Sequence, residues 1–321
     1  MKLKETDFKL LCYLYHHYRE PFSKIAKAIG LTRPQVEYKI NKYMGEGIIR
    51  KFFPVFNWKK LGYSCIIILL LKFEKPKMAE EFSKNLNKSR NCMSYGKVYG
   101  KYEVYMNCIF KDEQELNNFI SKLFENKENF ITDYLLINPQ FIELYPLKIF
   151  EYSNSENYPL ISNESRQVKL DKTDMNILKI LSKNGREKLI NIAIKANISS
   201  ELALYRLKRL KSEGIILGNR IQFDMAKLGY FFSLILINFR NFSKSNKEKI
   251  EAFVKKSKNI NSLIFNLQKP NCILQIFHKE EKEVRVKVDE IKKLFNEESI
   301  DIEILPLGEE EVEIRPLPFL D

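Results

Sequence analysis

The chain has 321 residues, of which 45% are apolar, and its 54 Lys and Arg against 41 Asp and Glu give a formal net charge of +13. This length and apolar content can fill ordinary hydrophobic cores in more than one domain, which excludes a wholly disordered protein. The basic balance makes a polyanion the first partner to consider.

The cysteines and the apolar segments point to a cytoplasmic protein without a membrane partner. Five scattered cysteines contain no C-x-x-C pair, so we expect reduced, buried thiols. The N-terminus lacks the apolar core of a signal peptide. The longest apolar run, 65–71, is about a third of the roughly 20 residues that a membrane helix needs, and its β-branched residues favour a buried strand.

The first predicted domain, 1–62, is a winged helix-turn-helix. Apolar residues at helical spacing follow Thr6 and Asp7, a second helix covers 22–29, and Gly30 can end it. Thr32 and Gln35 form a capping box at the start of a third helix, with Pro34 in its first turn. The apolar run that follows predicts two short strands, which would form the wing.

The third helix is predicted to enter the major groove of DNA. Its first residues would reach base edges and its later cations would meet phosphates. Arg33 can pair with guanine and Gln35 with adenine. The candidate DNA-binding residues of this copy, including two in the wing, are Thr32, Arg33, Gln35, Lys39, Lys42, Arg50 and Lys51.

Residues 63–150 predict a ferredoxin-like domain. Strand-like and helix-like runs alternate in the order β-α-β-β-α-β, which is typical of a sandwich with its helices on one face of an antiparallel sheet. The segment 151–167 is rich in Ser, Asn and Glu, and we interpret it as a linker.

The rest of the chain repeats the first part at an offset of 167 residues. The offset carries Gly47-Ile48-Ile49 onto Gly214-Ile215-Ile216 and Leu61-Gly62-Tyr63 onto Leu228-Gly229-Tyr230. We therefore predict an α+β chain with a second winged helix-turn-helix at 168–229 and a second ferredoxin-like domain at 230–321. The net positive charge lies in the two helical domains, +8 in 1–62 and +7 in 168–229, which marks them as the parts that meet a polyanion.

The third helix of the second copy has its own candidates. Ser199 can cap it, and Leu202, Leu207 and Leu210 are expected to face inward. The candidate DNA-binding residues are Ser199, Ser200, Glu201, Arg206, Lys208 and Arg209, with Leu204 on the same face. For each side chain the alternative is a solvated helix face, in which Glu201 only complements the helix dipole.

The segments T-D...L-L, I-A-K-A-I-G-L-T, E-G-I-I and L-G-Y, followed by the β-α-β-β-α-β unit, resemble the Lrp/AsnC transcription regulators in both copies. The resemblance implies double-stranded DNA as partner and second domains that oligomerise and sense a small molecule such as an amino acid. Here it implies an intrachain pseudo-dimer, open to further homo-oligomers.

The family's glycine-rich turn suggests a ligand site at Gly100, Tyr102 and Glu103, although a plain hairpin turn explains this segment as well. The second copy has lost the glycine and the acid in Leu267–Cys272. Because the two recognition helices differ, we expect the pseudo-dimer to favour an asymmetric operator.

Enzyme motifs are missing from the sequence. The three histidines are too few and too dispersed for most metal sites, and no phosphate-binding loop, nucleophile elbow or H-E-x-x-H occurs. We therefore expect no catalytic residue, no metal, no cofactor and no enzyme activity. The alternative is a tetrapyrrole-binding enzyme on the same scaffold, similar to siroheme decarboxylases, in which His17 or Arg19 would touch the tetrapyrrole.

Overall fold

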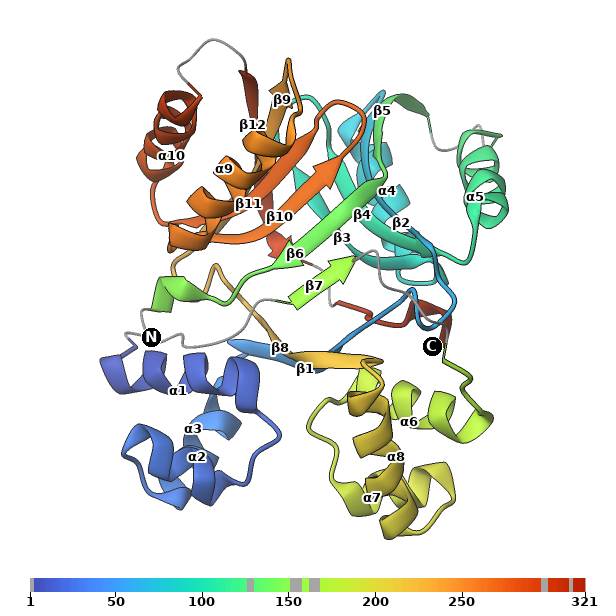
Figure 1. Ribbon diagram of the computed structural model, residues 1–321, viewed down its shortest axis with the longest axis vertical. Coiled ribbons are helices and arrows are strands. Elements are labelled where there is room, and N and C mark those ends of the chain that lie inside the picture. The colour runs from blue at the N-terminus through green and yellow to red at the C-terminus, as the bar shows by residue number, and fades with distance from the viewer. Residues whose placement is uncertain are drawn as a thin grey trace.

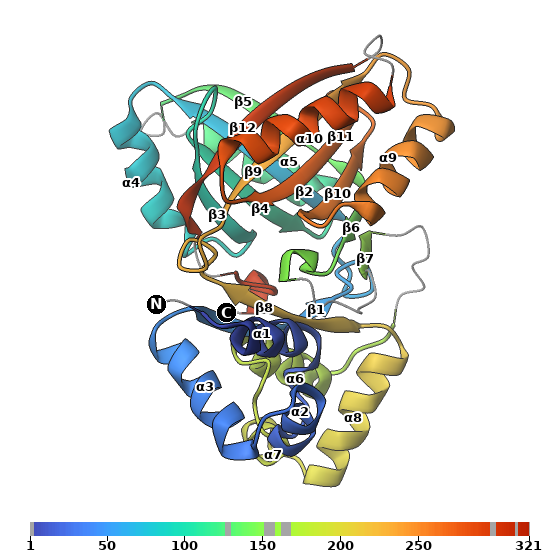
Figure 2. The ribbon, with the colours of Figure 1, turned by 90° about the vertical axis from the view of Figure 1, so that its left-hand side faces the viewer.

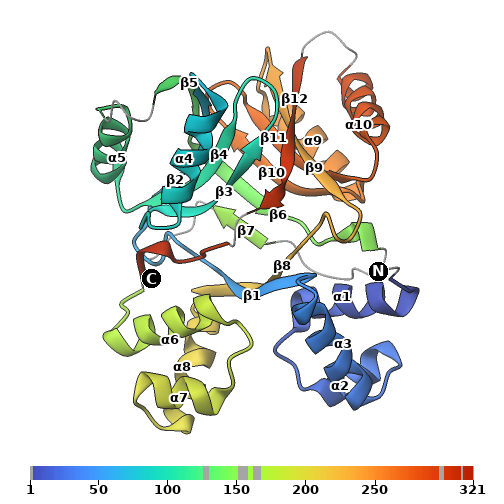
Figure 3. The same cartoon turned by 180° about the vertical axis from the view of Figure 1, so that it is seen from behind.

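The computed structural model describes residues 3–125, 130–150, 158–161, 168–295, 300–311 and 314–320. Two layers make up the molecule: two three-helix modules at one end, and a large sheet with its covering helices at the other (Figure 1). A two-stranded ribbon lies between the layers (Figures 1 and 3). The chain thus combines two helix-turn-helix modules with two α+β domains, as the sequence predicts.

The helical modules correspond closely to the predicted helices. Their bounds are α1 (Glu5–His17), α2 (Phe22–Ile29) and α3 (Arg33–Gly45) in the first module, and α6 (Lys172–Lys183), α7 (Leu189–Ala196) and α8 (Ser200–Ser212) in the second. Gly30 ends α2 at a φ of 73°, a conformation that glycine adopts without strain. In α3, Val36, Ile40 and Tyr43 are buried as the helical pattern predicts.

The predicted wing of two strands per module is wrong. Each module contributes one strand, β1 (Ile49–Phe56) or β8 (Ile216–Phe223), and these two pair with each other in an antiparallel ribbon. Each of these segments stays extended over eight residues and does not fold back into a hairpin, although Gly218-Asn219 in the second could form a tight turn. The ribbon therefore joins the modules to each other.

The sheet contains two ferredoxin-like halves. The first is built from β2 (Cys65–Phe73), α4 (Pro76–Leu86), β3 (Cys92–Val98), β4 (Val104–Phe110), α5 (Glu113–Glu125) and β5 (Ile131–Ile137). The second is built from β9 (Phe231–Phe239), α9 (Lys244–Lys256), β10 (Ile260–Asn266), β11 (Cys272–His278), α10 (Glu281–Leu294) and β12 (Ile300–Glu311). The strand order β5-β2-β4-β3-β12-β9-β11-β10-β6-β7 shows the same arrangement twice.

Exchanged strands join the halves. The end of β12 pairs with β3 of the first copy, and β6 (Pro139–Leu144) of the first copy pairs with β10 of the second. Because β6 follows β5 after a single residue, the sheet closes on itself. The two copies therefore form an intrachain pseudo-dimer.

Both faces of this sheet are buried. Along β2, Cys65, Ile67 and Leu69 pack under the covering helices, whereas Ile66 and Ile68 face the interior of the closed sheet. This alternation between two cores explains why the strand is apolar at almost every position. The helices α4 and α5 cover one half from outside, and α9 and α10 cover the other (Figures 1 and 2).

Three smaller features complete the description. The predicted linker 151–167 lies outside the described residues except for β7 (Tyr158–Ile161), which pairs with β6. All five cysteines are buried and reduced. No helix within the described ranges is long and apolar enough to cross a membrane.

Candidate nucleic-acid interface

The recognition helices α3 and α8 begin at the end of the molecule farthest from the sheet, because their C-terminal ends lead directly into the ribbon. They lie on opposite sides of the helical layer (Figure 2). Their first turns are thus presented outward, as a groove-reading helix requires.

The first turn of α3 is fixed by its capping box. The Thr32 hydroxyl accepts a hydrogen bond from the Gln35 amide at 3.4 Å, and Gln35 Oε1 accepts one from the Thr32 amide at 2.9 Å. Thr32, Arg33 and Gln35 are all exposed. Because Gln35 Oε1 is already used within the helix, the expected bidentate pair with adenine is not available in this geometry.

Lys39, expected to meet phosphate, is instead part of an internal ion pair. Its ammonium group contacts the carboxylate of Asp7 on α1, and Tyr43 donates to the same carboxylate at 2.6 Å. The Lys42 ammonium group lies 3.9 Å from the carboxylate of Glu46, the residue that follows the helix. The Lys39 side chain therefore binds α3 to α1.

The second module repeats this arrangement with arginines. Arg206 contacts Asp171 at 2.6 Å and Asp174 at 3.2 Å, and Arg209 also contacts Asp174, which is fully buried. Arg206 is equivalent to Lys39 and Asp174 to Asp7 at the repeat offset. Lys208 is exposed. Helical spacing shows that a cation lies off the apolar stripe but does not reveal a buried aspartate on a neighbouring helix.

The outer face of the second module is apolar, which the sequence reasoning missed. Ile190 and Ile194 on α7 are 63% and 70% exposed, and Tyr205 on α8 is 60% exposed. Leu202, expected to face inward, is 37% exposed, because Ala203 takes the buried position equivalent to Val36. The spacing of Ile190 and Ile194, opposite the buried Ile192, was the signal available.

The same positions in the first module are mostly polar. Ser23 and Lys27 stand where the second module has Ile190 and Ile194, and Gln35 stands in place of Leu202. Tyr38, equivalent to Tyr205, is exposed in the same way. The two modules thus have the same helices at equivalent positions, but the side chains on their outer faces differ in polarity.

The two cations assigned to the wing lie in the ribbon. Arg50 contacts Asp224 of the other copy at 2.7 Å, and Lys51 follows it on β1. The ribbon adjoins the C-terminal ends of α3 and α8, on the opposite side from their first turns (Figure 3). Arg50 therefore connects the two copies.

The turn at Gly100 packs within the pseudo-dimer. Tyr102 is buried, and Glu103 Oε2 accepts a hydrogen bond from the Phe73 amide at 2.8 Å. In the second copy, Asn271 Oδ1 accepts a hydrogen bond from the Phe239 amide at 3.0 Å. The side-chain amide of Asn271 thus makes the contact that the carboxylate of Glu103 makes in the first copy. These contacts are those of a packed hairpin.

Of the two residues of the tetrapyrrole alternative, Arg19 lies at the contact between the modules and His17 lies on the surface of the first module. Arg19 donates to the Gly185 carbonyl and, at 3.2 Å, to the Glu187 carbonyl of the second module. His17 Nδ1 lies 3.9 Å from Glu20 on its own module. Among the described residues, no group of three or more His, Cys, Asp and Glu side chains is placed to hold a metal ion.

The fold and this surface define a DNA-binding protein with two helix-turn-helix modules. A family model described as winged helix-turn-helix DNA-binding matches residues 3–50 and 170–216. The chain is 32% identical over 120 residues to the HTH-type transcriptional regulator FL11 of Pyrococcus abyssi, an alignment that covers 37% of this chain and 79% of that protein. It is 28% identical over 120 residues to the HTH-type transcriptional regulator Ptr1 of Methanocaldococcus jannaschii, with 37% and 80% covered.

The chain belongs to the Lrp/AsnC family of helix-turn-helix transcription regulators. The relatives cover little more than a third of it because the chain contains the regulator plan twice.

A second comparison corrects the expectation that the chain has no enzyme activity. The crystal structure of the siroheme decarboxylase NirDL covers 99% of this chain and 96% of its own with a TM-score of 0.66 at 16% identity. An enzyme thus has the whole two-copy arrangement, so the absence of known motifs does not exclude enzyme activity on this scaffold, and the prediction of a non-enzyme is withdrawn. At this identity the likeness shows the fold alone.

Proposed function

We propose that this regulator recognises an asymmetric DNA site, with α3 and α8 reading two unlike half-sites. The observation that carries the proposal is the comparison of equivalent positions. The buried positions of the two recognition helices are hydrophobic in both copies, whereas Ser200, Leu202 and Ile194 stand at the positions equivalent to Arg33, Gln35 and Lys27.

The half-site of α3 is read by polar contacts. Arg33 is exposed in the first turn, where its guanidinium group can donate two hydrogen bonds to O6 and N7 of guanine. Thr32, which caps the helix, is exposed beside it and can reach a base edge or a phosphate.

The half-site of α8 is read largely by apolar contacts. Leu204 is 42% exposed and Tyr205 60% exposed on the face that would enter the groove. In the major groove the C5 methyl group of thymine is the feature that apolar side chains contact. We therefore assign a thymine-containing half-site to the second module, with the Ser199 and Ser200 hydroxyls as its polar contacts.

Phosphate contacts come from exposed lysines. Lys27 on α2 and Lys208 on α8 are exposed cations on their modules. Lysine ammonium groups that neutralise phosphates raise the affinity for all sequences alike and make it depend on salt. Lys39, Arg206 and Arg209 are left out of this set because they bind aspartates within the modules.

Selection of binding sites from random DNA with the full chain tests the proposal. We expect a site with two different halves. Arg33→Ala should relax the preference at one half, whereas Ser200→Ala, at the equivalent position, should leave that half unchanged. A selection that returns only perfect palindromes would contradict the proposal. A small-molecule effector also belongs to the proposal, supported by the cavity described next.

A further inference from the structure

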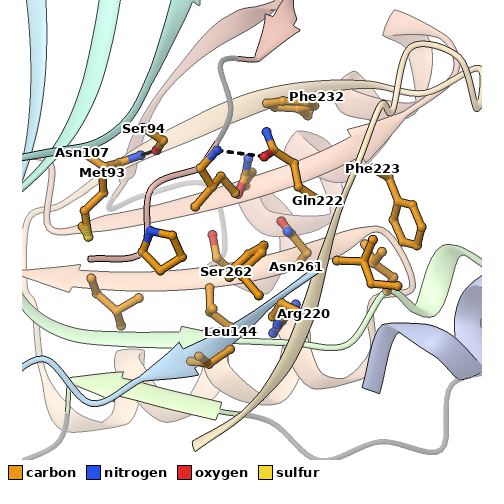
Figure 4. A pocket seen from close by; sticks show the side chains of 18 of the residues that line it. Met93, Ser94, Asn107, Leu144, Arg220, Gln222, Phe223, Phe232, Asn261 and Ser262 are labelled. Atoms are coloured by element: carbon orange, nitrogen blue, oxygen red, sulfur yellow. Dashed lines mark hydrogen bonds between the residues drawn. The ribbon is translucent and has the colours of Figure 1, made fainter. Parts of the chain in front are cut away.

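A cavity of about 280 Å³ lies between the ribbon and the interior of the closed sheet (Figure 4). Both copies line it, with Trp58 and Ile68 from the first and Phe223 and Phe232 from the second. The lining is mostly apolar. The volume is just below the range of about 300–1,000 Å³ that is typical of small-molecule sites, so the cavity suits a small ligand.

Arg220 is the one charged side chain among the described residues that line this cavity. It is 4% exposed. Its Nη1 atom donates to the Tyr15 hydroxyl and, at 3.1 Å, to the Tyr145 carbonyl, and the guanidinium carbon lies 4.8 Å from the centre of the Tyr15 ring. These contacts fix the orientation of the guanidinium group at one end of the cavity.

The neighbourhood of Arg220 favours a negative partner. Burial, followed by the charges of Arg220 and His17, lowers the pKa of His16 to about 3, so His16 is neutral at physiological pH. A second like charge is thus excluded next to the guanidinium group by desolvation and repulsion. An anion at this position would instead be stabilised by the attraction of the guanidinium group.

Other polar groups gather at the same end. Asn261 Oδ1 is buried and has no hydrogen-bond partner among the described residues. Gln222 Oε1 accepts a hydrogen bond from the Ile314 amide at 2.8 Å (Figure 4). A buried acceptor without a donor is unfavourable, so a ligand that carries a donor would relieve a cost already present in the fold.

The positive charge of the cavity lining comes from one copy. Arg220 and Gln222 of β8 are equivalent to Phe53 and Val55 of β1 at the repeat offset. Ser94 and Asn107 of the first copy also line the cavity, but they are uncharged and bond to each other at 2.9 Å. The cavity therefore has its charge at one end, which suits one ligand in one orientation.

We propose that this cavity binds a small monocarboxylate with an apolar body. Arg220 binds the carboxylate through charge-assisted hydrogen bonds, Asn261 accepts from a hydroxyl or amino group next to it, and the apolar lining holds the body. A ligand with several acidic groups fits less well, because the cavity is small and only one described lining residue, Arg220, is positively charged.

The cavity wall connects the ligand to the DNA-reading helices. β1 and β8 form one side of the cavity and directly follow α3 and α8. A ligand that sets the spacing between ribbon and sheet would shift the relative placement of the two helices. This regulatory part rests on the proposed function, and coupling of this kind is reciprocal: DNA changes the ligand's affinity by the same factor.

The chain contains its own reporter. Trp58 is the single tryptophan, it lines the cavity, and its Nε1 atom donates to the Pro316 carbonyl at 2.9 Å. Tryptophan fluorescence of the full chain can therefore follow titration with sodium hexanoate and with 2-heptanone, a neutral molecule of nearly the same shape.

We expect a saturable response to hexanoate and an affinity for 2-heptanone about tenfold or more lower, as expected for the loss of a charged hydrogen-bond partner. Arg220→Gln should abolish this preference, and Arg220→Lys should keep part of it. Asn261→Leu should remove the extra affinity expected for 2-hydroxyhexanoate. Lys84→Ala, an exposed position on α4 outside the cavity, serves as the control and should change none of these affinities.

Equal affinities for the acid and the ketone, or no saturable response to hexanoate, would overturn the assignment. If Arg220→Gln does not fold, the affinities of the unaltered chain for hexanoate and 2-heptanone still test the assignment. Displacement of hexanoate by an iron tetrapyrrole, followed by absorbance, would assign the cavity to that class instead. DNA binding of the full chain is measured separately, in the absence of hexanoate. A failure to bind DNA would contradict the proposed function but would not affect the conclusion about the ligand.

Discussion

Buried aspartates govern the recognition helices at the scale of single residues. Asp7 and Asp174 each bind a cation of the helix that would read DNA, Lys39 in one module and Arg206 in the other. A cation on an outer helix face is usually assigned to solvent or to phosphate. Here an acidic partner one helix away makes it part of the fold.

Asp7→Asn should therefore destabilise the chain. Burial tends to raise the pKa of Asp7, but hydrogen bonds from Lys39 and Tyr43 outweigh it and the pKa is lowered. A lowered pKa in the folded state stabilises the fold above the ordinary value of 3.8, and this stability is lost as the pH falls through the lowered pKa. We expect a loss of about 1–3 kcal/mol at pH 7, the cost of removing one charged hydrogen-bond partner.

Urea unfolding of the full chain at several pH values measures this effect. The difference in the free energy of unfolding between the unaltered chain and Asp7→Asn should shrink below pH 3.8. Glu5→Gln is the matched control, since Glu5 lies on the same helix as Asp7 but its side chain is 69% exposed, with the Lys9 ammonium group at 2.8 Å. A pH-independent difference would show that the charge of Asp7 is not the cause.

At the scale of elements, the ribbon and the turn before α7 lock two unlike copies together. The Gly185 amide donates to the Phe52 carbonyl of β1 at 2.8 Å. Gly185 is equivalent to Tyr18 at the repeat offset, and a Cβ atom at Gly185 would collide with the Tyr18 hydroxyl and lie 2.8 Å from the Phe52 carbonyl oxygen. A tyrosine in one copy thus fills the space that a glycine leaves in the other.

Gly185→Ala should destabilise the chain by about 1–3 kcal/mol, because the added methyl group overpacks a contact made partly by backbone. Thermal unfolding is the measurement. Gly45→Ala is the control, since a Cβ atom there has no neighbour within 4 Å and alanine favours helix. An unchanged midpoint for Gly185→Ala would show that the modules separate at little cost.

The apolar face of α8 leads to a prediction about DNA. Replacing thymine by uracil removes the C5 methyl group and keeps the base pair. In the half-site read by α8 we expect a loss of about fourfold in affinity for each methyl contact, because burying a methyl-sized group contributes about 0.8 kcal/mol. Fluorescence anisotropy with substituted operators measures it.

The half-site read by α3 provides the comparison for this measurement. Uracil in that half should have a smaller effect, since Arg33 and Thr32 offer polar contacts. Equal losses in both halves would contradict the assignment of thymine contacts to the second module.

At the scale of the whole molecule, strand exchange and the ribbon connect all four domains. β6 and β12 each join the opposite half of the sheet, and β1 pairs with β8. The C-terminal segment also returns to the first copy, where the Pro316 carbonyl accepts from Trp58. These contacts connect the four domains, so the chain does not divide into independent units.

We therefore expect a single cooperative unfolding transition. Trp58 fluorescence, which reports on the cavity, and far-ultraviolet circular dichroism, which reports on all helices, should give the same denaturation midpoint. Two separated transitions would show that the helical modules unfold apart from the sheet. Lys208→Ala, an exposed substitution, should leave both midpoints in place.

The sequence by itself determined the repeat, the helices and the α+β class, because these depend on local patterns. The Thr32 and Gln35 capping box, the stop at Gly30 and the order of strands and helices all follow from neighbours within a few residues. The family resemblance depends on the same local segments.

Only the tertiary structure decided which side chains are available for function. Pairing of β1 with β8, the partners of Lys39 and Arg206, and the exposure of Ile194 each depend on residues far away in the chain. The cavity at Arg220 is assembled from both copies and has no contiguous sequence signature. Local periodicity fixes an element, but contacts between elements decide which face of it is left for a partner.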